Sequence, residues 1–354
     1  MNDVRSGRIL IIGAGVIGLM TAWRLRSGGY DVVIIDPQPG AGATFAAAGM
    51  LAPHSEIAVG EETNYSLQRD ALVRWRDVVE LLTTQGFEAP ALNMVGTLIV
   101  GVDGGDRRLL SQHVAVMKSF GAAFRLLERV DHPESFAHLA DNVREGVLVP
   151  DEAWVNPDDV VRTLRNALIS LGVPTIAATV EHVTQGTPVT VVAGGETHAA
   201  DAVIVSTGAS AVPGLTDAPR VRPIRGITTR LMGVDRMGLP MVRAFVHGRP
   251  FYYVGRQNGY GVIGASAEER SDQRVELGES YRLLRDALEV LPALDGATVL
   301  ETRVGLRPVS EDATPFFVQL APGAIAVSNG HYRHGVTLAP LASSWALEWV
   351  RALS

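Results

Sequence analysis

The sequence contains no cysteine, and this absence narrows the chemistry that the chain can perform. Without cysteine there is no disulfide bond, no thiolate metal site, no cysteine nucleophile and no cofactor linked through sulfur. Any redox chemistry must therefore come from a bound cofactor.

Long apolar runs are also missing. No stretch reaches the roughly 18 apolar residues that a membrane-spanning helix needs, and the apolar run 9–20 is interrupted by three glycines. The first residues, Met1–Arg5, lack the basic start and apolar core of a secretory signal. We therefore expect no membrane span and a cytoplasmic location.

Positive charge is in deficit, with a formal net charge of −7. This disfavours nucleic acid as a partner, because binding it takes clustered Lys and Arg on one face. The 354 residues are 47% hydrophobic and 19% charged, which is typical of a compact enzyme. The length exceeds what a single hydrophobic core usually serves, so we expect two domains.

The N-terminal region has the pattern of a dinucleotide-binding βαβ unit. An apolar strand (8–12) precedes the motif Gly13-Ala14-Gly15-Val16-Ile17-Gly18, a helix (19–26) and a second strand (31–36). The glycines permit a tight turn and let the backbone approach a pyrophosphate at the helix N-terminus. Asp36 ends the second strand, where a carboxylate can bind a ribose hydroxyl. The alternative is a glycine turn used only for packing.

A second Gly259-x-Gly261-x-x-Gly264 pattern has a different interpretation. It follows Gln257-Asn258 and lies between two strand-like segments, and Asn-Gly is a strong hairpin signal. We therefore predict one dinucleotide site, which disfavours a reductase that binds two nucleotides.

The remaining pattern alternates between α and β. We predict helices at 65–84, 157–171 and 277–291, strands at 95–102, 201–209 and 324–328, and a C-terminal helix; Asn156 is the expected N-cap of the second helix. The fold class is α/β: a Rossmann-type cofactor domain (1–85, 146–215 and 303–354) with an inserted α+β substrate domain built on an antiparallel sheet (86–145 and 216–302).

Three further segments suggest ligand contacts. The tract 40–51 is too rich in glycine for a stable helix and too apolar for a solvated loop; it suits a backbone against a large flat ligand or, alternatively, a close-packed domain crossing. The turn 329–338 precedes the final helix, so its N–H groups could stabilise negative charge. Arg307, in Gly305-Leu306-Arg307-Pro308, offers a planar fork for a carboxylate.

His331 and His334 have no third ligand of suitable type and no carboxylate nearby, so we expect no metal.

Four segments together resemble the D-amino acid oxidase superfamily of FAD-dependent oxidoreductases, and within it the glycine oxidase (ThiO) branch. They are 11–18, Ala46-Ala47-Ala48-Gly49-Met50-Leu51-Ala52-Pro53, 305–308 and Gly330-His331-Tyr332-Arg333-His334-Gly335, in the right order over almost the full length. The chain departs from the usual Tyr-x-Val-Pro-Arg at 252–256, where Gly255 replaces proline, and has His334 where asparagine is more usual.

The resemblance implies an FAD-dependent oxidase that binds FAD non-covalently and oxidises glycine with dioxygen to iminoacetate, then glyoxylate, and hydrogen peroxide. It also implies a role in thiamine thiazole biosynthesis, with thiazole synthase as a partner, and a homotetramer. The alternatives are a sarcosine or D-amino acid oxidase, an amine dehydrogenase subunit, and more distantly a non-catalytic FAD-binding protein. Sequence alone does not rank the amines, because one methylene changes binding by only about 1–3 kcal/mol.

The resemblance also assigns site residues. Arg307 would grip the substrate carboxylate, Tyr252 would line the pocket, Arg333 would lie on the substrate side of the flavin ring, and Met50 would lie beside it. The cofactor would be bound by Gly13, Gly15, Val16, Ile17, Gly18, Asp36, Ala47, Ala48, Gly49, Met50, Val180, Thr207, Gly208, Gly330, His331, Tyr332, Arg333, Gly335, Val336 and Thr337.

Overall fold

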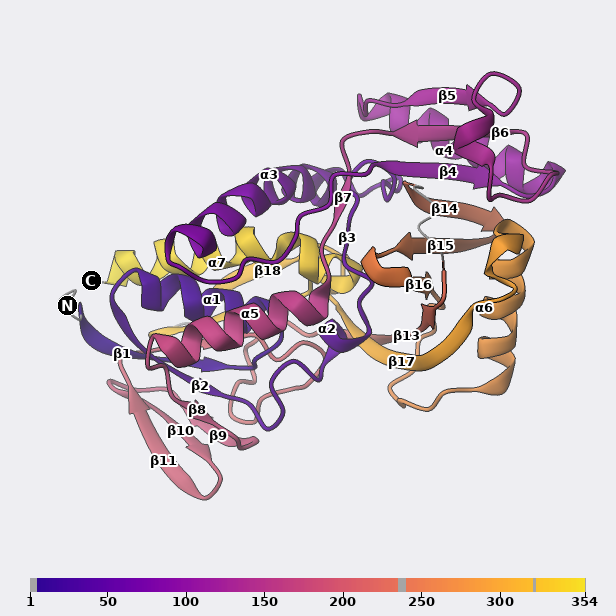
Figure 1. The fold of residues 1–354 in the computed structure, drawn as a ribbon. Helices are drawn as coiled ribbons and strands as arrows, with labels where there is room; N and C mark the ends of the chain where they lie inside the picture. Colours follow the sequence, from indigo (N-terminus) through magenta and orange to yellow (C-terminus); the bar gives the residue numbers. More distant parts are fainter. Residues whose placement is uncertain (1–4, 235–239, 321–322, 354) are drawn as a thin grey trace.

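The computed structural model describes residues 5–234, 240–320 and 323–353, which form two main sheets with helices packed on them (Figure 1). Residues 1–4, on which the expectation of no secretory signal partly rests, lie outside the described residues. Among the described residues, no helix is long and apolar enough to span a membrane.

The first sheet has six strands and carries the βαβ unit. Its order is β18 (Phe316–Leu320), β19 (Ile325–Asn329), β12 (Ala202–Val205), β1 (Arg5–Ile12), β2 (Tyr30–Ile35) and β8 (Thr175–Ile176). All neighbours pair in parallel except β18 with β19. Both faces of this sheet are covered, which explains why strands such as β12 are continuous apolar runs.

Helices cover one face of this sheet and a small sheet covers the other. The helices are α1 (Val16–Ser27), α3 (Glu62–Thr84), α5 (Pro157–Ser170) and α7 (Gly335–Leu353), and α1 packs against both α5 and α7. The small sheet is β9 (Val180–Thr184), β10 (Val189–Ala193) and β11 (Glu196–Ala200). Helix α1 is enclosed by its neighbours, and its sequence is apolar on nearly every side, as is typical of a buried helix.

The second sheet has eight strands and forms the other lobe. Its order is β17 (Thr298–Val309), β13 (Arg222–Met232), β16 (Tyr260–Gly264), β15 (Arg249–Gly255), β14 (Met241–Val246), β4 (Thr97–Gly101), β6 (Glu145–Val149) and β5 (Arg125–Glu128). All pairs are antiparallel except β14 with β4. Helices α6 (Leu277–Val290) and α4 (Gly104–Ser119) pack on opposite faces.

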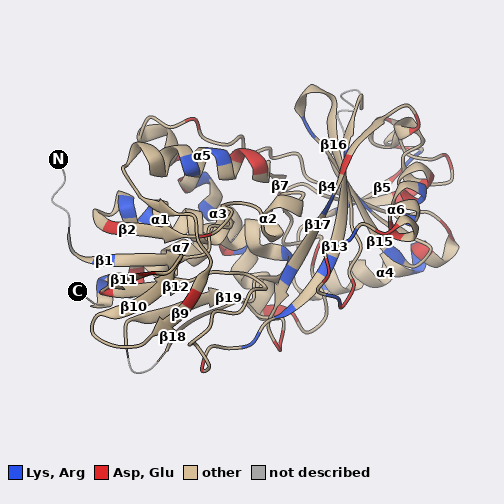
Figure 2. Ribbon diagram, turned by 90° about the horizontal axis from the view of Figure 1, so that it is seen from below, with Lys and Arg blue, Asp and Glu red and all other residues tan. Residues whose placement is uncertain are grey.

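Short elements join the two lobes: α2 (Ala43–Ala46), β3 (Met50–Leu51) and β7 (Ala153–Trp154), with β3 paired to β7. Four 3₁₀ turns complete the described chain: Pro133–Phe136, Gln257–Gly259, Pro292–Leu294 and Tyr332–His334. In Figures 1 and 2, β9–β11 lie at the opposite end of the molecule from α6 and β5, and Figure 2 shows charged residues of both signs on α5 and α6. The long strands β13 and β17 lie on the side of the second sheet that packs against α2.

The predicted α/β fold is confirmed, as are the strand–turn–helix start and the Asn156 cap, whose side chain accepts from the Asp158 N–H. The second glycine pattern forms the β15–β16 hairpin, with φ of 61° at Asn258 and 75° at Gly259. The division into two domains stays a prediction; by sheet membership, β6 (145–149) and β17 (298–309) both belong to the eight-stranded sheet and so cross the boundaries predicted near 145 and 302.

Candidate active site

One cavity of about 490 Å³ is lined by residues of both lobes. It contains most of the predicted site residues, although they come from segments far apart in the sequence. Those in its lining are Gly13, Gly15, Val16, Ile17, Asp36, Ala47, Ala48, Gly49, Met50, Thr207, Gly208, Tyr252, Arg307, His331, Tyr332, Arg333, Gly335 and Val336.

The turn after β1 leaves backbone donors free at the start of α1. The Asp36 carboxylate braces this turn by accepting the Ala14 N–H at 2.6 Å. The N–H groups of Gly15, Ile17 and Gly18 have no acceptor among the described residues. Free N–H groups at a helix N-terminus attract phosphate. The turn therefore fits the pyrophosphate of FAD.

The tract 40–51 passes along the cavity as α2 and then an extended segment. Gly49 has a φ of +82°, and a Cβ there would collide with the Val155 carbonyl oxygen, so only glycine fits. The Ala48 and Gly49 N–H groups are buried and have no acceptor within the described chain. Because buried N–H groups are almost always paired, these two require an acceptor from a ligand. The polar edge of a flavin provides such acceptors.

The turn after β19 brings the start of α7 to the same cavity. Helix α7 begins at Gly335, and Gly335 and Val336 line the cavity. Burial lowers the pKa of His331 to about 4, so its ring is neutral at pH 7, and its buried Nε2 has no partner in the described part of the chain. This end of α7 can stabilise negative charge on a bound ring.

Arg307 and Tyr252 meet above two glycines at the other end of the cavity. Arg307 comes from β17 and Tyr252 from β15, while Gly226 and Gly264 lie on β13 and β16 between them. A Cβ at Gly226 would collide with the Arg307 guanidinium, and one at Gly264 would collide with the Tyr252 ring. The two side chains therefore lean toward each other. Arg307 Nη1 donates to the Ser266 carbonyl at 2.9 Å, and its other nitrogens have no partner among the described residues.

Glu56 is a carboxylate in this cavity that no sequence motif predicted, and its side chain is only 11% exposed. Its oxygens lie 3.2 Å from Arg243, 3.3 Å from His334 and 3.8 Å from Arg333. Burial alone raises the pKa of Glu56, but Arg243, His334 and Arg333 outweigh burial and hold the pKa well below its usual value. The expectation that no carboxylate lies near His334 is wrong, because the fold brings residue 56 beside the C-terminal turn.

Arg243 and His113 also line the cavity without having been predicted. Arg243 Nη1 donates to the Ser55 carbonyl at 2.7 Å, which holds the loop before α3. The available signal was an arginine inside the otherwise apolar strand 241–246. Within the described residues, the two clusters with three candidate metal ligands lie elsewhere, at His247, Asp286 and Glu289 and at Glu268, Glu276 and Glu279.

Four of the predicted cofactor residues are absent from the cavity lining: Gly18, Val180, Gly330 and Thr337. A Cβ at Gly18 would collide with the carbonyl of the first glycine of the motif, so this residue lets α1 pack on β1. Val180 lies in the core beneath β9–β11, and Gly330 abuts an aromatic ring of β18. Thr337 Oγ1 donates to the Met50 carbonyl at 3.2 Å. Their contact with the cofactor stays a prediction.

Glu152 makes the stability of the loop before α3 depend on pH. It accepts the N–H groups of His54 and Ser55 at 2.8 and 2.7 Å, and burial outweighs these bonds and raises its pKa to about 7 from 4.5. The folded state therefore binds more protons than the unfolded state between these pH values. The free energy of unfolding should fall by about 2 kcal/mol from pH 5 to pH 7.

Urea unfolding at several pH values measures this effect. In Glu152→Gln the fall between pH 5 and 7 should disappear, since the amide can keep the same hydrogen bonds. Glu145→Gln, a change at an exposed position on β6, is the control and should leave the fall intact. An unchanged profile in Glu152→Gln would contradict the assignment.

The chain belongs to the family of FAD dependent oxidoreductases (DAO), whose family model matches residues 8–349. It is therefore a flavoprotein oxidoreductase, and FAD is its cofactor; with no cysteine in the sequence, the cofactor has no cysteine link. The free N–H groups at the glycine turn and at Ala48 and Gly49 fit this cofactor, as does the N-terminus of α7 at the cavity.

Two curated relatives and one solved structure illustrate the similarity. The chain is 30% identical to the putative thiamine biosynthesis oxidoreductase ThiO of Rhizobium etli, over 94% of this chain and 93% of the relative. It is 26% identical to the glycine oxidase of Geobacillus kaustophilus, over 94% and 90%. The structure of iminodiacetate oxidase from Chelativorans superposes with a TM-score of 0.87 and 26% identity, over 98% and 95%.

Proposed function

We propose that the protein is an oxidase of a small amino acid, with glycine as the first candidate. The observation that supports this most is the pair Arg307 and Tyr252, which converge in the cavity that also contains the glycine turn and the tract 46–50. Arg307 has free donors in a planar fork, which suits a carboxylate. A substrate held there would present its α-carbon to the cofactor.

FAD, when bound, supplies the two-electron oxidation of the carbon–nitrogen bond. The protein contributes position and charge: Arg307 binds the carboxylate, and Tyr252 lines the pocket. Burial raises the pKa of Tyr252 more than Arg307 lowers it, so the phenol stays protonated and can donate. Glu56, whose pKa is depressed, is a weak base, which agrees with a reaction that needs no protein base for the α-proton.

In the overall reaction glycine loses two hydrogens to become iminoacetate, and dioxygen gains them to become hydrogen peroxide. Iminoacetate then hydrolyses to glyoxylate and ammonia or passes to a thiazole synthase in thiamine biosynthesis. The relative named as a thiamine biosynthesis oxidoreductase and the relative named glycine oxidase both support this assignment.

A second candidate is an N-substituted glycine that carries another carboxylate. Arg243 lines the same cavity as Arg307, and its Nε and Nη2 have no hydrogen-bond partner among the described residues. The similarity to iminodiacetate oxidase supports this candidate.

Anaerobic titration of the purified protein tests the proposal. We expect the absorption bands of oxidised flavin, and we expect glycine to bleach them more efficiently than sarcosine, D-alanine or iminodiacetate. Bleaching by iminodiacetate in preference would favour the second candidate. A flavin spectrum that none of these amines bleaches would refute the proposed substrate class.

Asp36 provides a separate test of the cofactor site. Asp36→Ala should weaken FAD retention about tenfold, since a hydrogen bond to a charged group contributes roughly 1.5–3 kcal/mol. The dissociation constant is measured by reconstituting apoprotein, with Asp31→Ala, a partly exposed carboxylate near the start of β2, as control. Substrate preference of the remaining holoenzyme should not change. Normal FAD affinity in Asp36→Ala would remove the ribose assignment.

A further inference from the structure

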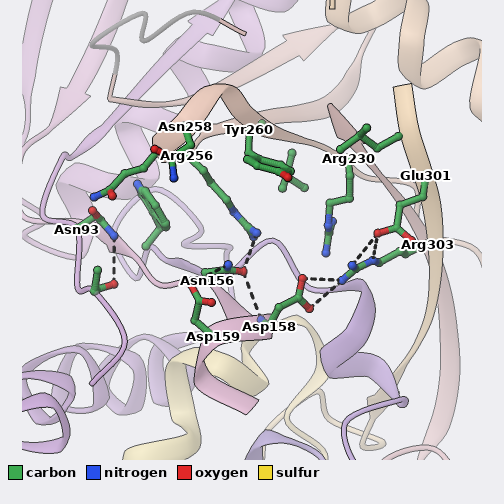
Figure 3. A pocket seen from close by; sticks show the side chains of 16 residues that line it. Asn93, Asn156, Asp158, Asp159, Arg230, Arg256, Asn258, Tyr260, Glu301 and Arg303 are labelled. Carbon is green, nitrogen blue, oxygen red and sulfur yellow. Dashed lines mark hydrogen bonds and ion pairs between the residues drawn. The ribbon is translucent and has the colours of Figure 1, made fainter. Parts of the chain in front are cut away.

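A second cavity, of about 310 Å³, is lined by arginines that bind the tract 45–48. Its lining includes Arg230 and Arg303 from the eight-stranded sheet, Arg256 from the turn after β15, and Asp158 from α5. Figure 3 shows Arg303 paired with Asp158 and Glu301, while Arg230 and Arg256 reach down from the sheet and the turn. Neither Arg230 nor Arg256 has been given a role by the proposed function.

Side chains of this sheet and of the turn after β15 bind every carbonyl group from residue 45 to residue 48. Phe45 O accepts from Arg303 Nη1 at 2.9 Å and Arg230 Nη2 at 3.2 Å, Ala46 O from Thr228 Oγ1 at 2.8 Å, Ala47 O from Arg230 Nη2 at 3.0 Å, and Ala48 O from Arg256 Nη2 at 2.9 Å. The tract is thus held along one side, while Ala46, Ala47 and Ala48 line the cofactor cavity.

These bonds also fix where the N–H groups of the tract point. In a trans peptide the C=O and the following N–H point in opposite directions, and the cis peptides of the described chain lie elsewhere. Arg230 on the Ala47 carbonyl therefore directs the Ala48 N–H away from the second cavity, and Arg256 on the Ala48 carbonyl does the same for Gly49. These are the two buried N–H groups of the tract for which the described chain offers no acceptor.

Arg230 is a buried cation and Arg256 a partly buried one, and neither has an ion pair within the described chain. Arg230 is 5% exposed, and burial lowers the pKa of Arg256 to about 10. The carboxylates that line this cavity near them already form ion pairs with other arginines: Asp158 pairs with Arg303, and Asp159 with Arg162 at 2.6 Å. Burying an unpaired cation is costly, so its presence here needs a compensating role.

We propose that Arg230 and Arg256 are positioning residues for the flavin, an inference that rests on the proposed cofactor site. By binding the Ala47 and Ala48 carbonyls they aim two N–H groups at the flavin ring and place positive charge behind them. Donors fixed in advance stabilise the charge that develops on the reduced ring. The pair therefore raises the reduction potential of the bound cofactor and speeds oxidation of the amine.

The test uses FAD-loaded Arg230→Met and Arg256→Met. In each, the reduction potential, measured with dithionite and a reference dye, should fall. The rate at which saturating amine bleaches the flavin should fall about 100-fold, as when one fixed donor is removed elsewhere. The apparent substrate constant should change little, because Arg307 is untouched. Arg230→Lys and Arg256→Lys keep the charge but lose the fork, so they should give intermediate values and serve where the Met variants fail to fold.

Arg303→Met is the matched control. It removes a cation from the same cavity, yet the Phe45 carbonyl keeps its bond to Arg230, and the peptide N–H groups at 48 and 49 keep their aim. Its potential should stay near that of the unmodified protein. An equal fall in Arg303→Met would overturn the proposal, since charge alone would then explain the effect, and so would an unchanged potential in the folded Met or Lys variants.

Failure of the proposed function would give a different result from failure of the inference about Arg230 and Arg256. Chemical reduction needs no amine, so the potentials can be compared even where no tested amine bleaches the flavin. Unmodified protein that holds FAD but reacts with no amine would refute the substrate class and leave this inference standing. Unmodified protein that binds no FAD would refute both.

Discussion

Arg307→Ala is expected to raise the substrate concentration for half-maximal rate about 100-fold, because losing the partner of a buried carboxylate costs roughly 2–5 kcal/mol. The flavin should remain bound, since Arg307 lies at the Tyr252 end of the cavity, away from the glycine turn. Steady-state oxygen consumption over a range of glycine concentrations measures the change, and the flavin absorbance of the same sample reports cofactor content.

Two matched variants make this result specific. Arg307→Lys keeps the charge but loses the planar fork, so it should lie between the alanine variant and the unmodified protein. Arg222→Ala removes an exposed arginine of the neighbouring strand and should have no effect. If Arg307→Ala left the half-saturation concentration unchanged, Arg307 would not be the carboxylate ligand.

Glu56→Ala is expected to lower the free energy of unfolding by about 3–5 kcal/mol, because it leaves the cations around a largely buried carboxylate without a partner. The depressed pKa sets the pH dependence: Glu56 contributes stability above its unfolded pKa of 4.5, and that contribution is lost as the pH falls toward the folded pKa. In Glu56→Gln, the free energy of unfolding should therefore fall less as the pH is lowered through the acid range. Urea unfolding between pH 3 and pH 8 measures both effects.

Glu61 offers the control for this prediction. It pairs with Arg333 at 3.4 Å but is more exposed than Glu56, so Glu61→Ala should cost less than about 1 kcal/mol. Similar losses of unfolding free energy in the two variants would show that the position of Glu56 among several cations adds nothing to stability.

The parts of the fold that could be predicted from sequence are those that depend on residues close together in the sequence. The strand, glycine turn and helix from 8 to 26 follow one another directly, and the hairpin at Asn258-Gly259 depends on two adjacent residues with positive φ. Arg307, Tyr252 and the tract 46–50 could be named because short motifs carry them, and the structure places all of them in one cavity.

The parts that could not be predicted depend on contacts between distant segments. Glu56 lies in an irregular loop with no motif, and its meaning comes only from Arg243, Arg333 and His334, which reach it from other elements. The proposed role of Arg230 and Arg256 likewise depends on hydrogen bonds to carbonyl groups about two hundred positions earlier in the chain. Val180, assigned to the cofactor by resemblance, has its side chain in the core, and its contact with the cofactor stays a prediction.

The glycines beneath Arg307 and Tyr252 have an evolutionary consequence. Both lie inside strands, where glycine has a poor propensity, yet each leaves the space that its neighbouring side chain fills. A single added methyl group at Gly226 or Gly264 would move the guanidinium or the phenol without changing either functional group. Related enzymes could therefore diverge in the amines they accept through mutations that leave Arg307 and Tyr252 themselves unchanged.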